Sequence, residues 1–168
     1  MDDLSGRTAL VAGASGPVGQ ALLERLLEDG AYARVIAAVR RPLARRHPKL
    51  VSVTVDFHRI ADFRRELVAD DVYCCLGNTL ARAGSKEAFR RVDYDYCVEL
   101  ARVARAAGSR SFVLVSAAGA SPRSSIFLSR VKGELEDAIR RIGFRRYFVV
   151  RPALLEGERV GRALARCF

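Results

Sequence analysis

Three glycines spaced three residues apart, near the start of the chain, constrain the fold more than any other feature. Gly13, Gly16 and Gly19 stand in the stretch LVAGASGPVGQALLERLL, between an apolar run and leucines at helical spacing. Glycine permits a tight turn off a strand and allows backbone to approach another backbone closely. The stretch therefore predicts a strand, a tight turn and a helix in direct succession.

The rest of the chain repeats this alternation of apolar runs with helical patterns. Strands that are apolar throughout are typical of a parallel sheet covered on both faces. We predict one α/β domain over residues 1–168, a doubly wound, Rossmann-type sheet of about six strands with helices on both faces. The expected strands are residues 7–12, 33–39, 50–55, 71–76, 111–116 and 146–150, and the expected helices are residues 16–28, 60–67, 85–107 and 124–142.

Charge and hydropathy narrow the range of partners. The chain carries a formal net charge of +10, which favours anionic partners such as a nucleotide cofactor, nucleic acid or acidic lipid. Because the basic residues are scattered and lack an aromatic platform, we do not expect a nucleic-acid-binding module. No apolar run approaches the roughly 20 residues of a membrane span. The start, MDDLSGR, lacks the apolar core of a signal peptide, so we expect a cytoplasmic protein.

The cysteines and histidines show no ligand spacing. No two cysteines form a C-x-x-C pair and two of the four are adjacent, which is typical of neither a zinc site nor a disulfide framework. We predict buried, reduced thiols and no metal site. The residues concerned are Cys74, Cys75, Cys97, Cys167, His47 and His58.

The glycine turn lies where a dinucleotide fingerprint would lie, directly after the first strand and at the start of the first helix. In that setting Gly13 permits the turn, Gly16 lets a pyrophosphate approach the backbone, and Gly19 lets the helix pack near the strand. The helix N-terminus offers free N–H groups and a partial positive charge to phosphates. The alternative is a turn with close helix packing that binds no ligand.

The residues after the second predicted strand indicate which dinucleotide is bound. An NAD site usually has an Asp or Glu there for the ribose hydroxyls, but this chain has VRRP and no acidic residue between Asp29 and Asp56. Arg40 and Arg41 suit a 2′-phosphate because guanidinium presents a planar fork of donors, and Ser15 can add a hydroxyl. We predict NADP(H) in preference to NAD; alternatively, both arginines are solvated surface residues.

Further motifs follow the glycine turn along the chain. They are VRRP, VDF at residues 55–57, CCLGNT at residues 74–79, FVLVSAAGA, VKGELE and VVRPALLEGER. With the spacing G-x-x-G-x-x-G, they resemble the atypical short-chain dehydrogenase/reductases, in particular the Tat-interacting-protein-like branch, whose bacterial members are regarded as NAD(P)-binding oxidoreductases. The resemblance covers nearly the whole chain, about residues 7–159, and CCLGNT and VKGE are more specific than the glycines.

The resemblance implies cofactor contacts beyond the glycines. Asp56 would lie beside the adenine, and Lys132 would hydrogen-bond the nicotinamide ribose. The backbone of Pro152 and of the two residues after it would line one side of the nicotinamide site. The loop after the fourth strand would line the adenosine and ribose with Cys75, Leu76 and Gly77, continued by Asn78 and Thr79. A plainer interpretation stays open, in which Asp56 caps the next turn and Lys132 is an exposed helix charge paired with Glu136.

The resemblance also implies chemistry by a Ser, Tyr and Lys triad, in which the tyrosine hydroxyl moves the proton. Tyrosine and lysine stand four residues apart on one helix face, but the residue four before Lys132 is Leu128. Ser116 ends the fifth strand at the family's serine position, although in related families that serine falls one or two residues later, where this chain has alanine. Other hydroxyl groups that remain as alternatives are those of Ser125, Ser129, Tyr94 and Tyr96.

Two functional hypotheses fit this pattern. In the first, the protein is an NADP(H)-dependent oxidoreductase that passes hydride between the nicotinamide and an unknown carbonyl or alcohol, with Lys132 and Ser116 as the surviving catalytic positions. In the second, it is a non-catalytic NADP(H)-binding sensor or interaction protein, which the missing tyrosine favours.

The end of the chain also departs from the family. By resemblance, members continue beyond RPALLEGER with a segment that covers the substrate cleft, whereas this chain ends at Phe168 after a short predicted helix, VGRALARCF. We expect an incomplete substrate wall and exposed apolar surface, to which Val160, Leu164 and Phe168 contribute. Because exposed apolar patches tend to find partners, we predict self-association into a homo-oligomer.

Overall fold

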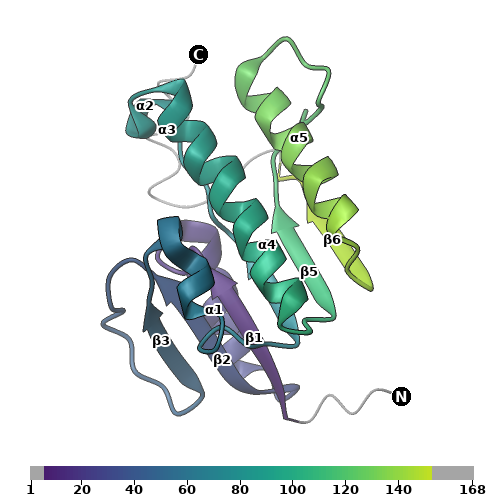
Figure 1. Cartoon of the computed structure of the whole chain (residues 1–168). Helices are drawn as coiled ribbons and strands as arrows, with labels where there is room; N and C mark the ends of the chain where they lie inside the picture. Colours follow the sequence, from purple (N-terminus) through teal and green to yellow (C-terminus); the bar gives the residue numbers. More distant parts are fainter. Residues whose placement is uncertain (1–5, 153–168) are drawn as a thin grey trace.

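Six parallel strands form the centre of the molecule. The computed structural model describes residues 6–152. The strands lie in the order β3-β2-β1-β4-β5-β6, and every neighbouring pair is parallel (Figure 1). Each lies within one or two residues of its predicted bounds. They are β1 (Arg7–Ala12), β2 (Tyr32–Val39), β3 (Leu50–Thr54), β4 (Asp71–Cys74), β5 (Ser111–Val115) and β6 (Arg146–Val150).

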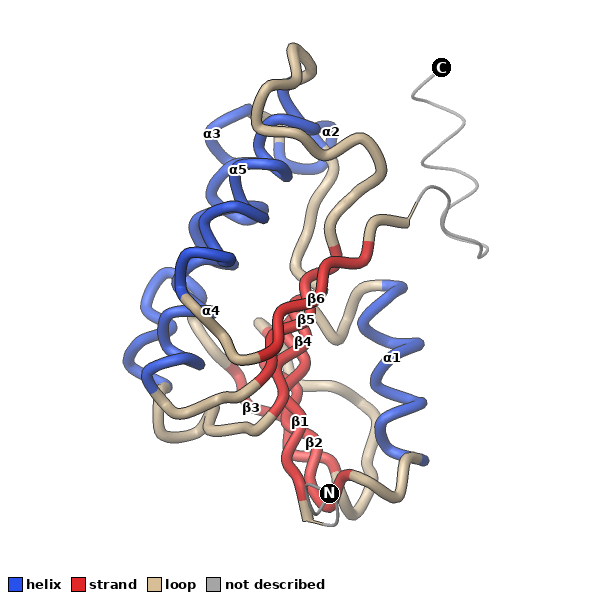
Figure 2. The backbone as a smooth tube through the Cα atoms, turned by 90° about the vertical axis from the view of Figure 1, so that its right-hand side faces the viewer, coloured by secondary structure: helices blue, strands red, loops and turns tan. Residues whose placement is uncertain are grey.

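Helices cover both faces of this sheet. Figure 2 shows α1 (Pro17–Glu28) on one side and α4 (Tyr96–Ala106) with α5 (Phe127–Ile142) on the other. The predicted doubly wound Rossmann-type fold is therefore confirmed. None of the helices described between residues 6 and 152 is long and apolar enough to cross a membrane. The shorter elements are the 3₁₀-helix η1 (Phe57–Phe63), α2 (Leu80–Ala83), α3 (Lys86–Arg90) and the π-helical turn η2 (Arg91–Asp95).

Two predicted helices differ from the structure. The helix expected at residues 60–67 is instead the 3₁₀ segment η1, which begins earlier because the Asp56 side chain accepts a hydrogen bond from the His58 N–H. The helix expected at residues 85–107 is divided into α3, η2 and α4 by the π-helical turn. Hydrophobic periodicity does not report such a turn, since the chain stays helical on either side of it.

The core explains why the strands read as continuous apolar runs. Successive side chains of a strand point to opposite faces of the sheet. In β1, Leu10 and Ala12 belong to the cluster that packs on the α4 and α5 side, whereas Ala9 and Val11 belong to the cluster on the α1 side. All four are fully buried. A sheet buried on both faces leaves no position in its central strand for an alternating polar residue.

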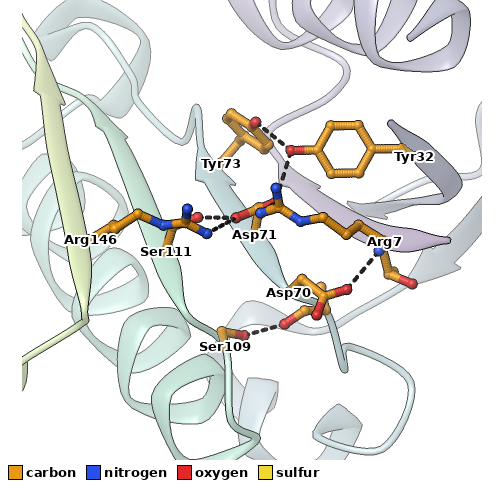
Figure 3. Close-up of polar contacts among 10 residues, drawn as sticks. Arg7, Tyr32, Asp70, Asp71, Tyr73, Ser109, Ser111 and Arg146 are labelled. Carbon is orange, nitrogen blue, oxygen red and sulfur yellow. Dashed lines mark hydrogen bonds and ion pairs between the residues drawn. The ribbon is translucent and has the colours of Figure 1, made fainter. Parts of the chain in front are cut away.

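The strands also share a buried polar cluster at their amino-terminal ends (Figure 3). Asp71, the first residue of β4, is almost fully buried and pairs with the guanidinium of Arg7 at the start of β1. Its carboxylate also accepts hydrogen bonds from the hydroxyls of Tyr32 and Ser111, and Arg146 lies 3.8 Å away. One carboxylate therefore links the first residues of five strands: β1, β2, β4, β5 and β6.

Buried tyrosines make the fold sensitive to alkaline pH. Burial raises the pKa values of Tyr32, Tyr73 and Tyr147 above the ordinary 10.0, and the Tyr32–Tyr73 hydrogen bond raises that of Tyr32 further. Because the unfolded chain then loses these protons at lower pH than the folded chain does, their contribution to stability is complete below about pH 10 and is lost above it.

We expect the free energy of unfolding to fall by up to about 1.4 kcal/mol per pH unit for each such tyrosine above pH 10. Urea unfolding from about pH 8 to about pH 11 measures this loss. The slope against pH should be smaller in Tyr32→Phe than in the parent protein, because one buried phenol has been removed. Equal slopes would show that Tyr32 does not contribute to alkaline unfolding.

Candidate functional site

The candidate site lies at the carboxyl ends of β1 and β4. These strands are neighbours in the sheet although the chain leaves β1 toward β2 on one side and returns to β4 on the other. Such a switch point opens a crevice between the two loops that follow the strands, and ligands of open α/β sheets bind there. The Cys75 N–H donates to the Ala12 carbonyl at 2.8 Å, which holds the two loops together.

Two of the three glycines are required by the protein's own packing. Gly13 has φ +83°, in the left-handed region, and a Cβ there would lie 2.5 Å from the Cys75 carbonyl oxygen. A Cβ at Gly19 would lie 2.2 Å from the Gly13 carbonyl oxygen, so only glycine lets α1 pack this close to the turn. A Cβ at Gly16 would meet only the Gly13 carbonyl oxygen, at 3.4 Å. Gly16 therefore presents bare backbone to the open side of the turn.

The start of α1 has the properties of an anion site. Gly16 is the N-cap residue and supplies no side-chain hydrogen bond, and Pro17 has no N–H. The side chain of Ser15 is exposed beside this terminus. The remaining N–H groups of the first turn and the helix dipole favour negative charge. The turn thus fits the pyrophosphate of a dinucleotide, with Gly16 allowing close approach.

The residues after β2 and β3 lie at the same edge of the sheet. Arg40 and Arg41 directly follow β2 and are exposed, and neither takes part in an ion pair among residues 6–152. Asp56 follows β3 and caps η1 through the His58 N–H, as the plainer interpretation of this residue predicted. Its other carboxylate oxygen makes no hydrogen bond or ion pair among residues 6–152, so the cap leaves a role toward adenine open.

The loop after β4 continues from the switch point toward α5. Cys75 and Leu76 are half-buried and Gly77 is exposed. Burial raises the pKa of the Cys75 thiol to about 12, so it is a neutral group near pH 7. The Asn78 N–H donates at 2.9 Å to the carboxylate of Asp93, which fixes the end of this loop.

Asp93 is the functional candidate that sequence reasoning missed. Its carboxylate lies 2.8 Å from the Lys132 ammonium nitrogen, and both side chains are buried. The interpretation of Lys132 as an exposed charge paired with Glu136 is therefore wrong. A Cβ on Gly77 would lie 3.8 Å from the Lys132 nitrogen, so Lys132 reaches the loop after β4. No local pattern marks Asp93, because its partner lies far along the chain, in α5.

Ser116 lies in a polar cluster separate from the Asp93–Lys132 ion pair. The Ser116 hydroxyl donates to the buried carboxylate of Glu136 at 2.6 Å. Arg151 donates to the same carboxylate, at 3.0 Å from Nε and at a shorter distance from its terminal nitrogen. Pro152 follows and accepts a hydrogen bond from the Ala118 N–H at 3.2 Å. The Ser116 proton is thus held by Glu136 rather than directed at a substrate position.

The residue that faces solvent one helical turn before Lys132 is Leu128. Its side chain is 37% exposed in the first turn of α5. The two tyrosines considered as substitutes have other contacts: the ring of Tyr94 lies 4.4 Å from the Arg90 guanidinium carbon, and the Tyr96 hydroxyl is 2.7 Å from His58 Nε2. Ser125 is exposed and Ser129 is half-buried near Gly119. Nothing in residues 6–152 places a phenol against Lys132.

Comparison with known proteins identifies the family. A family model described as NAD(P)H-binding matches residues 13–165. The chain belongs to this NAD(P)H-binding family. It is 34% identical over 173 residues to Protein HTATIP2 of Rattus norvegicus, covering 98% of this chain and 71% of that protein. It is 38% identical over 154 residues to "Protein fmp52, mitochondrial" of Aspergillus fumigatus, covering 88% of this chain and 66% of that protein. These relatives confirm the predicted resemblance to the Tat-interacting-protein-like branch.

Solved structures share the fold of this NAD(P)H-binding chain at lower identity. A putative NAD-dependent epimerase/dehydratase from Bacillus halodurans aligns with TM-score 0.73 and 24% identity, covering 91% of this chain and 73% of that one. UDP-glucose 4-epimerase of Thermotoga maritima aligns with TM-score 0.74 and 15% identity, covering 89% of this chain and 56% of that one. The chain thus spans little more than half of the epimerase and about two thirds of the fungal relative.

Proposed function

We propose that this protein binds NADP(H) and acts as an oxidoreductase of the atypical short-chain dehydrogenase class on an unknown carbonyl or alcohol. The observation that carries the proposal is Gly16. Gly13 and Gly19 are explained by contacts within the fold, whereas a Cβ at Gly16 would meet only the Gly13 carbonyl oxygen, at 3.4 Å, and Gly16 lies at a helix N-terminus beside the sheet's switch point. A glycine with no internal reason at that place is accounted for by a phosphate that needs close approach.

The proposed cofactor contacts follow the crevice from one end to the other. The bound nicotinamide would supply or accept the hydride. Arg40, Arg41 and Ser15 would hold a 2′-phosphate, and Asp56 would lie beside the adenine. Lys132 would hydrogen-bond the nicotinamide ribose, and Pro152 would line one side of the nicotinamide site. The remaining lining would come from Gly13, Gly16, Gly19, Cys75, Leu76 and Gly77. We propose a cytoplasmic homo-oligomer with no membrane or nucleic-acid partner, although the fungal relatives carry "mitochondrial" in their names.

A second function, a non-catalytic NADP(H)-binding sensor or interaction protein, is favoured by two observations. Leu128 cannot transfer a proton, and the hydroxyl of Ser116 is hydrogen-bonded to Glu136. Of the two catalytic positions proposed, Lys132 lies close to Gly77 in the loop after β4, whereas the Ser116 hydroxyl would first have to break its hydrogen bond to Glu136. Residues 153–168, which include the predicted terminal helix and its apolar residues, lie outside the described part of the chain.

Reversing the charge at Arg40 should remove the preference for NADPH over NADH. The parent protein should bind NADPH more tightly, because a charge-assisted contact to the 2′-phosphate contributes about 1.5–3 kcal/mol. Arg40→Asp loses this contact and adds repulsion, so NADPH affinity should fall about tenfold or more while NADH affinity changes little. Fluorescence titration of both reduced cofactors measures the two affinities.

Arg145→Asp serves as the matched control. Arg145 is exposed and directly precedes β6, the edge strand on the side of the sheet away from β2, which Arg40 follows. It makes the same change in net charge and should leave the ratio of affinities unchanged. Equal binding of NADPH and NADH by the parent would contradict the NADP preference. Absence of binding for both would overturn the proposed function itself.

A further inference from the structure

Asp93 is buried at a position where a charged carboxylate is energetically unfavourable without partners. It is 0% exposed, and it lies in the π-helical turn η2 rather than in a regular helix. Burying a carboxylate is unfavourable unless partners compensate for the lost water, and π-helical turns are frequent at functional sites. The turn directs Asp93 toward the loop after β4 and toward α5, so one side chain joins three elements.

One carboxylate oxygen of Asp93 is in an ion pair, and the other is in a hydrogen bond. One oxygen lies 2.8 Å from the Lys132 nitrogen, and the other accepts the Asn78 N–H at 2.9 Å. An ideal Cβ on Gly77 would lie 3.5 Å from the first oxygen and 3.8 Å from the Lys132 nitrogen. The ion pair therefore lies directly against the loop at Gly77, where a Cβ would be in ordinary van der Waals contact with both groups.

The charges around Lys132 favour its ammonium form. The ionisable groups that face it are Asp93 from η2, Cys97 from α4 and Cys74 from β4. Burial alone would lower the pKa of Lys132, but Asp93 and the two neighbouring thiols outweigh it, and the pKa is raised. Burial raises the pKa of Asp93, and the Lys132 ammonium together with the Asn78 N–H opposes that rise.

We propose that Asp93 is a positioning residue that holds Lys132 protonated and fixed against the loop at Gly77 and Asn78. Its effect on the cofactor rests on the proposed function, since Lys132 is the group that would contact the ribose. In this chain no tyrosine stands one turn before Lys132, so Asp93 supplies the fixed contact that a buried ammonium needs. A purely structural role would keep the loop in place without requiring the charge of Asp93.

The test reads the protonation of Lys132 directly in the full chain. The sequence has three lysines, Lys49, Lys86 and Lys132, so isotope-labelled lysine gives three side-chain NMR signals whose pH titration yields each pKa. In the parent, Lys132 should titrate above the ordinary lysine pKa of 10.5 despite its burial. Asp93→Asn keeps the shape and an acceptor for Asn78 but removes the charge. It should lower the pKa of Lys132 by about 1–3.

Asp95→Asn is the matched control, since Asp95 lies in the same turn but is exposed, and it should leave the Lys132 titration unchanged. The proposal is overturned if Lys132 of the parent titrates below the ordinary lysine pKa of 10.5, a result that needs no variant. It is also overturned if a folded Asp93→Asn protein leaves the Lys132 pKa unchanged, or if Asp95→Asn moves it equally.

A second arm measures NADPH affinity against pH. In the parent and in Asp95→Asn the affinity should be flat from about pH 7 to about pH 9, because Lys132 stays charged. In Asp93→Asn it should weaken progressively as pH rises, by about tenfold or more once Lys132 is neutral. A flat Asp93→Asn profile beside a lowered Lys132 pKa would overturn the role toward the cofactor. If the parent binds no dinucleotide, the proposed function fails, while the NMR titration still decides whether Asp93 holds the charge.

Discussion

Replacing Asp71 by Asn is expected to lower the free energy of unfolding by about 3–5 kcal/mol. The carboxylate is almost fully buried and pairs with Arg7, while Tyr32 and Ser111 donate to it. The variant keeps the size of the side chain but leaves a half-buried guanidinium without its counter-charge. Because five strands start at this cluster, the loss should appear as one cooperative destabilisation rather than as local fraying.

Urea unfolding at pH 7 measures the change, and Asp62→Asn is the control. Asp62 pairs with Arg59 at 2.7 Å, but both side chains are largely exposed, and such pairs contribute only about 0–1 kcal/mol. The two variants make the same chemical change and differ in burial. If Asp71→Asn cost no more than Asp62→Asn, the cluster would not be a stabilising ion pair. Dinucleotide affinity should be unaffected in the folded fraction, since the cluster lies at the amino-terminal ends of the strands whereas the glycine turn follows the carboxyl end of β1.

The six strands and the main helices were predictable because each of them has a local signal. Strands buried on both faces, such as residues 9–12, are apolar throughout, and that pattern alone indicates a parallel sheet with two covered faces. The three glycines mark the turn after β1. Of these, Gly13 and Gly19 record contacts with Cys75 and with the turn itself, so the fold requires them whether or not a ligand binds. Gly16 is the one for which the fold shows no such contact, and the proposed phosphate contact rests on it.

The site was less predictable because its decisive contacts join residues that are far apart in the chain. Asp93 meets Lys132, and Ser116 meets Glu136, only after α4, β5 and α5 have packed together. In sequence, Lys132 and Glu136 stand at the i,i+4 spacing of a surface ion pair. That local interpretation was wrong because Lys132 pairs with the buried Asp93 and Glu136 accepts a hydrogen bond from the buried Ser116. The π-helical turn that aims Asp93 adds no visible change to the apolar pattern.

Introducing a tyrosine in place of Leu128 is expected to raise carbonyl reduction by about 10²–10⁴-fold. Position 128 lies in the first turn of α5, one turn before Lys132, and its side chain is partly exposed, so a phenol has room there. If the proton-transfer position is empty in this chain, the parent should hold NADPH but turn it over slowly or not at all with simple aldehydes and ketones. NADPH oxidation across a panel of carbonyl compounds measures the gain.

Three further variants determine whether the gain comes from the introduced phenol and Lys132 acting together. Lys132→Ala in the Leu128→Tyr background should remove whatever was gained, because the ammonium that lowers the phenol pKa is lost. Ile126→Tyr places the same side chain two residues earlier, before the helix begins, and should give no gain. The Ser116 hydroxyl donates a hydrogen bond to Glu136. Adding Glu136→Gln weakens that hydrogen bond and should therefore increase the gain in turnover further. Brisk turnover by the parent would show that another hydroxyl moves the proton and that position 128 is not where the mechanism lacks its proton donor.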